Sequence, residues 1–539
     1  MLRLGVILDS DKVPTWISIL IDELRLNESV NLVCAIRIGW QKSGSKSIAL
    51  RALYQFDNLV WPRKTNLIEK VQLQLPSDVP LLKLQTTTTE SKVSFSDEAL
   101  AAIDNYQPDL LLYFGSAGFS GKILSAAKHG IWTLQFGEHN HLGKVFPGFW
   151  EWYYSAPHSE IILKQLPGDP EKVNTISRLK ATTYSSSINR NESIILSKGI
   201  DTVKDAVLKL AIRGEHSMAG ETGDELLQNT SFQRRGKMPG FWHCLLTFLK
   251  LLKGGLYRAF AKAFFIEQWA IFINQTDDNL PSLTFRKFTD ITPPNDRIWA
   301  DPFVVTSNDR HYVFLEEQMM KSSKAHISCM ELGKDGTIIS SNIILDKPYH
   351  LSYPFVFQHE NTWYLVPEST ANRTVDLYEC TSFPIQWKHK RTLLSDISAV
   401  DSTILFHENR YWLFCSVQQR SSSSPNDYLY LYYTDDLLNG SWTPHQGNPV
   451  VSDPYSARPA GRIYASNTNL IRPSQICAPV YGYGISLNKI IELNEFRYKE
   501  VSIKTIIPNW HKNLKTVHTL NFNQDITITD GILKRFKFF

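Results

Sequence analysis

The spacing of hydrophobic positions changes character near residue 280. Before that point, short apolar runs, which predict buried strands, alternate with stretches of helical periodicity. The predicted strands are residues 4–8, 30–38, 108–114 and 130–135, and the predicted helices are residues 13–26, 98–105 and 120–129. Strands separated by helices of this length predict a parallel sheet, so we expect residues 1–200 to form a Rossmann-like α/β domain.

Residues 201–280 are expected to be a helical connector. A closing helix at 201–213 is followed by a polar, glycine-rich loop and by the apolar segment 241–273, which basic residues interrupt. One interpretation is a helical linker packed against a neighbouring domain, and the other is a basic amphipathic helix on a membrane surface. We recognise no bilayer-spanning segment and no signal peptide, so we expect a cytoplasmic chain, with peripheral membrane contact through 241–273 as the alternative.

After residue 280, short alternating strands and polar turns dominate, and an internal repeat is visible. Segments starting at Asp301, Tyr353 and Asp401 align without gaps, and a weaker fourth copy starts at Arg458. A repeat of about 50 residues built of short strands is typical of a β-propeller blade.

Two further segments complete the expected ring. Residues 481–493 leave room for a fifth blade, and residues 517–533 are expected to pair with the start of the region. We therefore predict a five-bladed β-propeller over residues 281–539, and α/β plus all-β for the whole chain.

Composition narrows the class of protein. The chain has 539 residues, 43% of them hydrophobic, and a net charge of +4, which excludes a disordered chain and argues against a dedicated nucleic-acid binder. Six scattered cysteines without a CxxC motif argue against a disulfide framework and a zinc site, and fit a reducing compartment. We expect no metal, and the sequence leaves any cofactor unidentified.

The repeat places candidate chemistry in one region. In a propeller, the residues that open the innermost strands face the central funnel, and the second strands end in acids here. The candidate catalytic residues are Asp301, Glu316, Glu317, Glu368 and Asp401, and the candidate binding residues of this region are Tyr353, Arg458, Arg462, Arg472 and Gln475. Converging acids, arginines and aromatics suit a sugar or sugar phosphate, and two carboxyl groups can act as acid and base on a glycosidic bond. The alternative is that single acids cap turns or pair with arginines.

The first family resemblance covers residues 1–200. The strand Gly130-Ile-Trp-Thr-Leu-Gln135 resembles the core of folate-dependent formyltransferases, whose members carry G-x-x-N-x-H there. Thr133 and Gln135 stand at the positions of the family's Asn and His, and Asp169 is a loose match for its Asp. In open α/β sheets, ligands bind beyond the carboxyl ends of the strands. The loop 136–149 is therefore the expected ligand region, with three candidate binding residues: His139, Asn140 and His141. The resemblance implies a formyltransferase-like fold with a rebuilt site and no formyl transfer.

The second resemblance covers residues 268–535. The motifs that carry it include Pro294–Phe303, Phe314–Glu317, Leu351–Pro354, Ala457–Arg462 and Arg472–Gln475. They look like the propeller domain of plant glucosamine inositolphosphorylceramide transferases, which bacterial proteins fuse to a formyltransferase-like domain. That module is similar to five-bladed arabinanases and xylosidases. The resemblance implies that Asp301 matches their base, that Tyr353 replaces a second Asp, and that the acid is Glu316, Glu317 or Glu368.

These features together predict a transferase of bacterial surface glycan or glycolipid biosynthesis. Its expected partner is a sugar nucleotide or lipid-linked sugar, and no nucleic acid. Two alternatives stay open: a glycoside hydrolase using the propeller acids, and a non-catalytic glycan-binding protein with an inactive formyltransferase-like domain.

Overall fold

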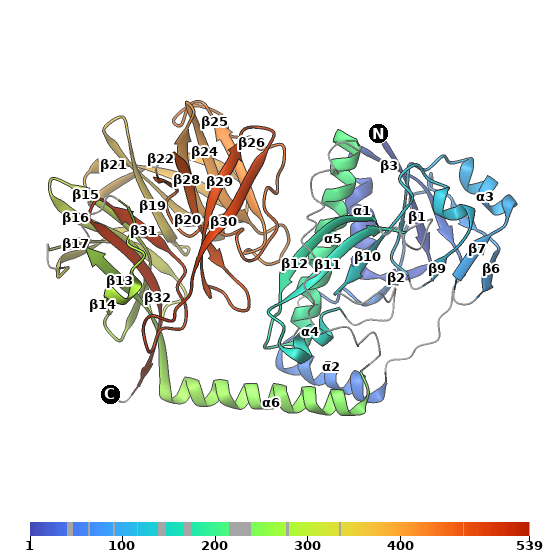
Figure 1. Cartoon of the computed structure of the whole chain (residues 1–539), viewed down its shortest axis with the longest axis horizontal. Coiled ribbons are helices and arrows are strands. Elements are labelled where there is room, and N and C mark those ends of the chain that lie inside the picture. Colours follow the sequence, from blue (N-terminus) through green and yellow to red (C-terminus); the bar gives the residue numbers. More distant parts are fainter. Residues whose placement is uncertain are drawn as a thin grey trace. The chain divides into compact units, whose positions relative to one another are not determined.

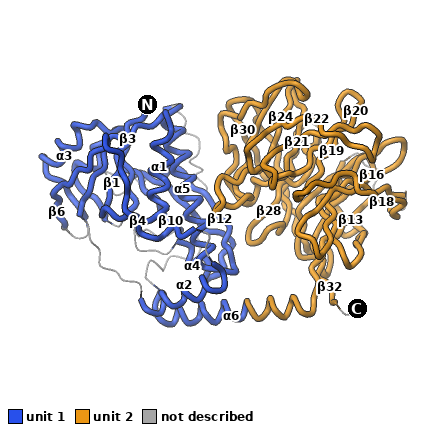
Figure 2. The backbone as a smooth tube through the Cα atoms, turned by 180° about the vertical axis from the view of Figure 1, so that it is seen from behind, with its two compact units in different colours: residues 1–254 blue, residues 255–539 orange. Residues whose placement is uncertain are grey.

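The chain divides into two compact units, Met1–Gly254 and Gly255–Phe539, which we call the N-terminal and C-terminal units (Figure 2). The computed structural model describes residues 1–539 except 40–46, 63–64, 90–91, 116, 138–146, 167–173, 215–238, 276–279, 334–335, 467 and 538–539. Each unit is described by itself below.

The N-terminal unit is built on a seven-stranded sheet with the order β12-β11-β10-β8-β1-β3-β5 (Figure 1). Five strands are parallel, and β11 and β12 form an antiparallel hairpin at one edge. The strands are β1 (Leu2–Leu8), β3 (Val30–Arg37), β5 (Leu81–Lys83), β8 (Leu110–Tyr113), β10 (Ile131–Phe136), β11 (His158–Gln165) and β12 (Asn174–Thr182). Two small sheets pair β2 (Lys12–Pro14) with β4 (Lys70–Gln72), and β6 (Thr86–Thr89) with β7 (Lys92–Phe95) and β9 (Gly118–Phe119).

Helices cover both faces of this sheet. On one face, Leu20 and Leu24 of α1 and Val203 of α5 share a buried core with the sheet, and on the other face Ile103 of α3 does so. The helices of this unit are α1 (Thr15–Arg25), α2 (Ile48–Val60), α3 (Asp97–Asp104), α4 (Phe149–Tyr154) and α5 (Ile188–Arg213). The predicted alternation of strands and helices and the parallel pairing are thus confirmed.

One predicted helix of this unit is wrong. Residues 120–129 form only a short 3₁₀ turn, Lys122–Ser125, instead of an α-helix. Gly121 and Gly130 bound the segment at positive φ, +83° and +66°, a backbone conformation that an α-helix does not use. Ile123 still packs this turn into the core, so the apolar positions correctly predict burial, whereas the predicted length of the helix is wrong.

Helix α6 (Phe241–Phe264) crosses the division between the units. Among the described residues, no helix combines the length and the apolar character that a bilayer crossing requires. The chain then continues as strand β13 (Phe265–Gln275), although the sequence predicts a helical connector up to residue 280. Both faces of β13 are covered from Ala270 to Ile273, and such a continuous apolar run does not distinguish a buried strand from a helix.

The C-terminal unit contains five four-stranded antiparallel sheets among its described residues. Three of them follow the chain: β15 (Arg297–Ser307), β16 (Arg310–Met319), β17 (Ala325–Leu332) and β18 (Ile338–Leu345); then β19 (Ser352–His359), β20 (Thr362–Ser369), β21 (Thr374–Ser382) and β22 (Gln386–Ser395); then β23 (Ala399–His407), β24 (Arg410–Val417), β25 (Leu429–Thr434) and β26 (Thr443–Pro444). The fourth has β27 (Tyr464–Ser466), β28 (Asn469–Ile476), β29 (Gly484–Leu493) and β30 (Tyr498–Ile506). The fifth has the order β14 (Thr289–Ile291), β13, β32 (Ile526–Phe536), β31 (Leu520–Asn523).

The three gapless repeats are confirmed as the first two strands of successive sheets. The C-terminal segment does pair with an early strand, but its partner lies before residue 281, in the predicted helical connector: β32 pairs with β13 along its whole length, from Phe265↔Phe536 to Gln275↔Ile526. The assignment of residues 481–493 to a further sheet is wrong, since β29 lies between β28 and β30 in the fourth sheet. The fifth sheet is instead assembled from the two ends of the unit.

Candidate functional site

Three equivalent residues open the first strands of successive sheets in an unusual conformation. Asp301, Tyr353 and Asp401 have φ of +50°, +43° and +54°, and the strand register skips at each of them. Such a bulge turns one side chain out of the regular alternation, and a left-handed backbone is costly for residues other than glycine. Positions held this way repeatedly in one unit are candidates for a shared role.

Hydrogen bonds from these bulges link neighbouring sheets. Asp301 donates its backbone N–H to Asp530 Oδ2 of β32 (2.8 Å), and Tyr353 donates its own to Asp301 Oδ2 (3.3 Å). Asp401 donates its N–H to Glu368 Oε2 of β20 (3.3 Å). The bulges therefore bring acids of four sheets into one cluster, which we call the acid cluster.

The fourth sheet reaches the cluster through Gly461 and Gln475. Gly461 donates its N–H to the Tyr353 hydroxyl (2.7 Å), and Gln475 donates its side-chain amide to Asp401 Oδ2 (2.7 Å). At φ +136°, a Cβ at Gly461 would collide with the Leu520 carbonyl, so this close approach requires glycine. All five sheets thus contribute to the acid cluster.

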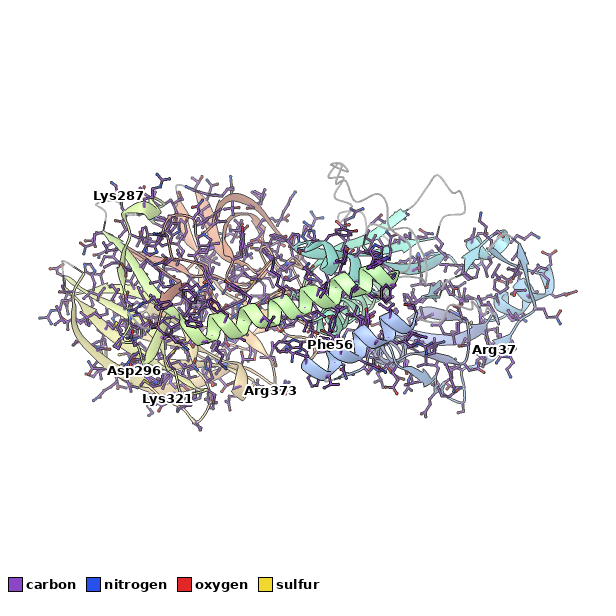
Figure 3. All side chains as sticks on the ribbon, turned by 90° about the horizontal axis from the view of Figure 1, so that it is seen from below. Arg37, Phe56, Lys287, Asp296, Lys321 and Arg373 are labelled. Carbon is purple, nitrogen blue, oxygen red and sulfur yellow. The ribbon has the colours of Figure 1, made fainter. Side chains whose placement is uncertain are left out.

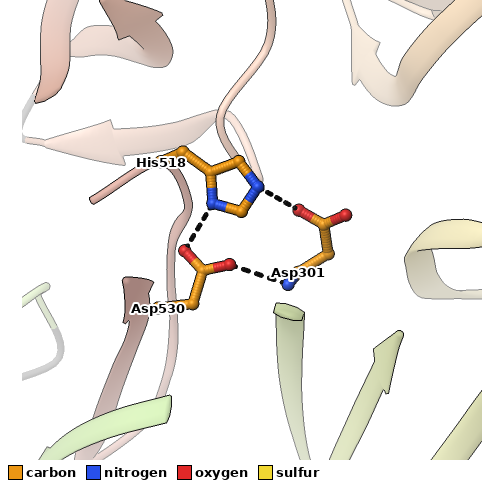
Figure 4. Close-up of side chains that lie close together, drawn as sticks. All are labelled: Asp301, His518 and Asp530. Carbon is orange, nitrogen blue, oxygen red and sulfur yellow. Dashed lines mark hydrogen bonds and ion pairs between the residues drawn. The ribbon is translucent and has the colours of Figure 1, made fainter. Parts of the chain in front are cut away.

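His518 lies between two carboxylates of the cluster (Figure 4). Its Nε2 is 3.2 Å from Asp301 Oδ1, and its Nδ1 is 2.8 Å from Asp530 Oδ1. Burial lowers the pKa of His518, but the negative charges of Asp530 and Asp301 outweigh burial, and the net pKa is raised. The Trp269 ring covers the imidazole at a centroid distance of 4.2 Å. A protonated His518 would neutralise part of the negative charge here.

Arg458 is the second cation of the cluster. Its Nε and Nη2 donate to the two oxygens of Asp401 at 2.5 and 3.2 Å, and its Nη1 donates to Asn426 Oδ1 at 2.9 Å. The guanidinium stacks on the Tyr481 ring at 4.9 Å. A bidentate contact of this kind fixes the Asp401 side chain in orientation.

Three other carboxyl groups of the cluster have raised pKa values. Burial and the neighbouring acids raise the pKa of Asp301 to about 7, so its carboxyl group exchanges a proton near neutral pH. Burial, followed by the charges of nearby carboxylates, raises the pKa of Glu316 and Glu368 well above the usual range, which favours their neutral forms. The cluster therefore places two carboxyl groups that favour the neutral form beside one that titrates near neutral pH, which is the combination that acid–base chemistry needs.

Glu317 belongs to a different environment. Its carboxylate accepts from Arg297 (2.8 Å), Ser328 (2.6 Å) and Trp299 (3.3 Å). Although burial opposes ionisation, His326, whose Nε2 lies 3.4 Å from Glu317 Oε2, and these donors lower its pKa to about 2. The structure thus separates the two neighbouring glutamates on β16, and Glu317 has the contacts of a structural acid.

The remaining arginines are engaged by other groups. Arg472 is held by both oxygens of Glu500 at 2.6 and 2.8 Å, between β28 and β30. Arg462 donates to the Val356 carbonyl and stacks on Phe355, and burial lowers its pKa to about 10. Arg462 borders the cluster through the Gly461 turn, whereas the contacts of Arg472 tie it to the outer strands of its sheet.

The candidate residues of the N-terminal unit do not form a comparable cluster among the residues that the structure describes. Thr133 is fully buried, and the Gln135 side chain donates to the Gly137 carbonyl and accepts from Lys164 Nζ (2.7 Å). The Thr133 hydroxyl has no hydrogen-bond partner but is enclosed in the core, and the Gln135 amide is already engaged. The binding candidates His139, Asn140 and His141, and also Asp169, lie outside the described residues.

Sequence reasoning missed His518 and Asp530. Both lie outside the repeated segments, and Asp530 reaches Asp301 only because β32 joins β13 from the other end of the unit. With Asp301, they place potential ligand atoms within 4.8 Å of one another, a spacing that could hold a metal ion. The hydrogen bonds already account for this spacing, so the expectation of no metal stays a prediction.

Comparison with known proteins gives one family match. Residues 273–524 match the family model "Glucosamine inositolphosphorylceramide transferase 1, N-terminal". The rice enzyme of that name (Oryza sativa subsp. japonica) is 34% identical over 207 residues, which is 38% of this chain and 28% of the enzyme. The Arabidopsis thaliana enzyme is 34% identical over 226 residues, 41% of this chain and 29% of the enzyme.

Solved structures give distant matches. A family 117 glycoside hydrolase from Zobellia galactanivorans is 10% identical with a TM-score of 0.32, covering 50% of this chain and 90% of that one. A Bacillus subtilis arabinanase is 11% identical with a TM-score of 0.33, covering 44% and 93%.

These matches set the extent of the similarity. The chain spans less than a third of the curated relatives it matches, and its residues 1–272 lie outside the family model. The relatives come from plants, so they give no support to the expected bacterial setting, and nothing in them supports the formyltransferase-like assignment. What is shown is a C-terminal unit related to the N-terminal part of plant glycolipid glycosyltransferases.

Proposed function

We propose that the five sheets of the C-terminal unit are the blades of a propeller with the acid cluster at its axis. Hydrogen bonds from all five sheets to the cluster support this arrangement. The N-terminal unit is proposed to be a Rossmann-like, formyltransferase-like domain, on the basis of its parallel strands and their covering helices.

The chain is proposed to act as a glycosyltransferase of glycolipid assembly, with a sugar donor and a lipid acceptor meeting at the acid cluster. The single observation that carries this is the convergence of carboxyl groups, two of them with raised pKa, around a buried arginine that contacts Asp401, within the segment related to the plant transferases. We place the chain in the cytoplasm because the described cysteines are all free thiols.

The cluster suggests a division of roles. Asp301, with a pKa of about 7, can accept the proton of an acceptor hydroxyl at neutral pH, since a base works best near the pH of its surroundings. Glu368 is neutral and can donate a proton to the oxygen of the leaving group, and the Asp401–Arg458 pair fixes its position through the Asp401 N–H. Glu316 is a second neutral acid beside Asp301.

Two other functions use the same residues. A neutral acid and an ionised carboxylate on one site also serve glycoside hydrolysis, in which water replaces the acceptor. A cluster so fully engaged in its own hydrogen bonds also suits a glycan-binding module without turnover. The three functions differ in their product, so one experiment separates them.

The experiment incubates the full chain with labelled sugar nucleotides and with inositolphosphorylceramide in detergent micelles. Label in the lipid phase supports transfer, free sugar supports hydrolysis, and bound but unchanged sugar supports a binding module. Asp301→Asn tests whether any product depends on the cluster, and Glu500→Gln, a buried acid paired with Arg472, is the control. Turnover that survives Asp301→Asn would remove the acid cluster from the reaction.

Formyl transfer is not part of the proposal. Because Thr133 and Gln135 replace the Asn and His that stabilise the oxyanion, the barrier should rise by roughly 3–4 kcal/mol. We expect no formylated amino sugar when the chain is incubated with 10-formyltetrahydrofolate and an amino-sugar nucleotide. Formylated product above the no-enzyme control would show that the site has been rebuilt around other residues.

A further inference from the structure

Helix α6 carries a row of large apolar side chains on its outer side. Trp242, Leu246, Leu249, Leu256 and Phe260 are 70%, 51%, 50%, 72% and 54% exposed. Their spacings of three, four and seven residues place them on one face of the helix. We call this row the outer face of α6.

The opposite side of α6 is the one that packs. Cys244, Thr247 and Leu251 are buried, and Cys244 and Leu251 share a core with Leu53 and Trp152 of the N-terminal unit. Phe248 beside them stacks edge-on against Phe56 at 4.8 Å, and Figure 3 shows Phe56 next to the helix. Since the opposite side of the helix already packs into the core of the N-terminal unit, the outer face is not the side that this core uses.

The charge of the segment has a single sign. Between Phe241 and Ile266 the sequence contains no Asp or Glu, and it contains Lys250, Lys253, Arg258 and Lys262. Lys253 is exposed within the outer face, where its long aliphatic stem can lie along apolar surface while the ammonium reaches water or a headgroup. Leu, Trp and Phe on one face of a basic helix are the composition of helices that lie in a membrane interface.

The end of β32 adds aromatic and basic groups beside the helix. Lys534 Nζ lies 3.2 Å from the Tyr257 hydroxyl and 4.0 Å from the Phe265 ring centroid. Phe536 stacks on Phe264, and the Lys537 ammonium donates to the Lys262 carbonyl. The C-terminal half of α6 is thus flanked by further cations that anionic headgroups would attract.

We propose that the outer face of α6 docks on an anionic bilayer surface, with the helix lying in the plane of the membrane. Charge decides between a membrane and a second copy of the chain as the occupant. Two copies of α6 packed face to face would bring basic helices together without an acid on either, whereas an anionic lipid surface complements them. The proposal needs neither the transferase activity nor the acid cluster.

The test is co-sedimentation of the full chain with phosphatidylcholine vesicles, with and without phosphatidylserine, at low and high salt. We expect pelleting with the anionic vesicles at low salt and release at high salt. The variant Leu249→Gln/Phe260→Gln should weaken binding roughly tenfold or more, because two apolar side chains no longer enter the interface. Both side chains are exposed, so the melting temperature should not fall.

The control variant replaces two exposed apolar side chains that lie outside α6. Ile339→Gln/Ile503→Gln changes two exposed side chains, 61% and 54%, on strands β18 and β30, and it should bind vesicles like the wild type. Failure of the wild type to pellet, binding that ignores lipid charge, or an outer-face variant that binds like the wild type would each overturn the proposal. A dimer that the outer-face variant converts to a monomer, without vesicle binding, would assign the face to a second copy.

Discussion

Glu316 and Glu317 are neighbours on strand β16, yet their side chains meet opposite surroundings. Glu317 receives charged and polar donors that lower its pKa to about 2, while burial and the neighbouring acids raise the pKa of Glu316. The pleat of a strand sends successive side chains to opposite faces, so a shift of one position exchanges a structural acid for a reactive one.

This difference gives a paired prediction. Glu317→Gln should lower the melting temperature by roughly 5–10 °C, because it leaves Arg297 facing an amide in a buried site. Glu316→Gln should leave the melting temperature nearly unchanged, since a neutral acid is replaced by a neutral amide, but it should reduce turnover roughly a hundredfold. Calorimetry and the product assay on both variants check this. The reverse pattern would mean that Glu317 is the functional acid.

Asp301 makes stability depend on pH in a defined window. The pKa of its carboxyl is about 7 in the folded chain, against 3.8 for an unperturbed Asp carboxyl. Between these values the unfolded chain has already lost the proton that the folded chain keeps, so the contribution of Asp301 to stability falls as the pH rises. Asp301→Asn removes this contribution.

The measurement is the melting temperature of Asp301→Asn minus that of the wild type at several pH values. We expect this difference to grow by about 5 °C or more between pH 4 and pH 8. A flat difference would show that Asp301 is ionised throughout, paired with His518. Asp376→Asn, which alters a buried acid bonded to Thr374 and Thr392, is the control.

The sequence located most of the acid cluster for a physical reason. Asp301, Tyr353 and Asp401 hold equal places in three repeats, and Glu316 and Glu368 hold equal places on the second strands, so a gapless alignment predicts their proximity. His518 and Asp530 have no counterpart in a repeat, and only the pairing of β32 with β13 brings them in. The sequence also could not tell which of Glu316 and Glu317 has the raised pKa, because the pKa depends on the groups that surround each carboxyl in the fold.

At the scale of elements, the left-handed bulges decide how the sheets meet. Tyr353 shows this most clearly, since a bulky residue at φ +43° persists only where surrounding contacts hold it. Its hydroxyl accepts from Gly461 and lies 2.9 Å from Thr403 Oγ1, so one side chain joins the second sheet to the third and the fourth.

Tyr353→Phe tests this junction. The substitution leaves the buried Gly461 N–H without its acceptor, which costs about 1–3 kcal/mol. We expect the melting temperature of the C-terminal unit to fall by roughly 2–4 °C for each kcal/mol lost. Tyr411→Phe is the control, because its partner, His359, is only half buried and its hydrogen bond can be replaced by water. Equal effects of the two variants would show that the junction is unimportant.

The strands that belong to the repeat of about 50 residues could be predicted from the sequence. The sheet that joins the two ends of the C-terminal unit could not be predicted in full. The first three repeats have strand pairs of similar length with polar turns between them, which periodicity detects. In the fourth sheet, Arg458 precedes a short strand, Tyr464–Ser466, so counting repeats placed β29 in a sheet of its own. The strands that the repeat did not predict are β13 and β14. Strand β13 overlaps the apolar segment 241–273, whose continuous apolar run predicts a helix, and β14 follows it along the chain.

At the scale of the whole molecule, the two units have separate cores and contain separate sheets. We therefore expect two melting transitions. In the C-terminal unit, strand β32 contributes both to a sheet and to the acid cluster. It forms the centre of the closing sheet with β13 over 11 residues, and it carries Asp530, which holds both Asp301 and His518.

Deleting residues 526–539 should therefore abolish one transition and spare the other. Without β32, strand β13 loses its partner along its whole length, and the Asp301 N–H and the His518 imidazole lose their shared carboxylate. Strands β13 and β31, which β32 separates and pairs with, would be left with unpaired edges, so the unit should unfold and aggregate. Calorimetry should show only the transition of the N-terminal unit, and deletion of residues 538–539 alone should leave both. If the chain lacking β32 kept both transitions, the closure would not be what stabilises the C-terminal unit; if it lost both, the two units would fold as one.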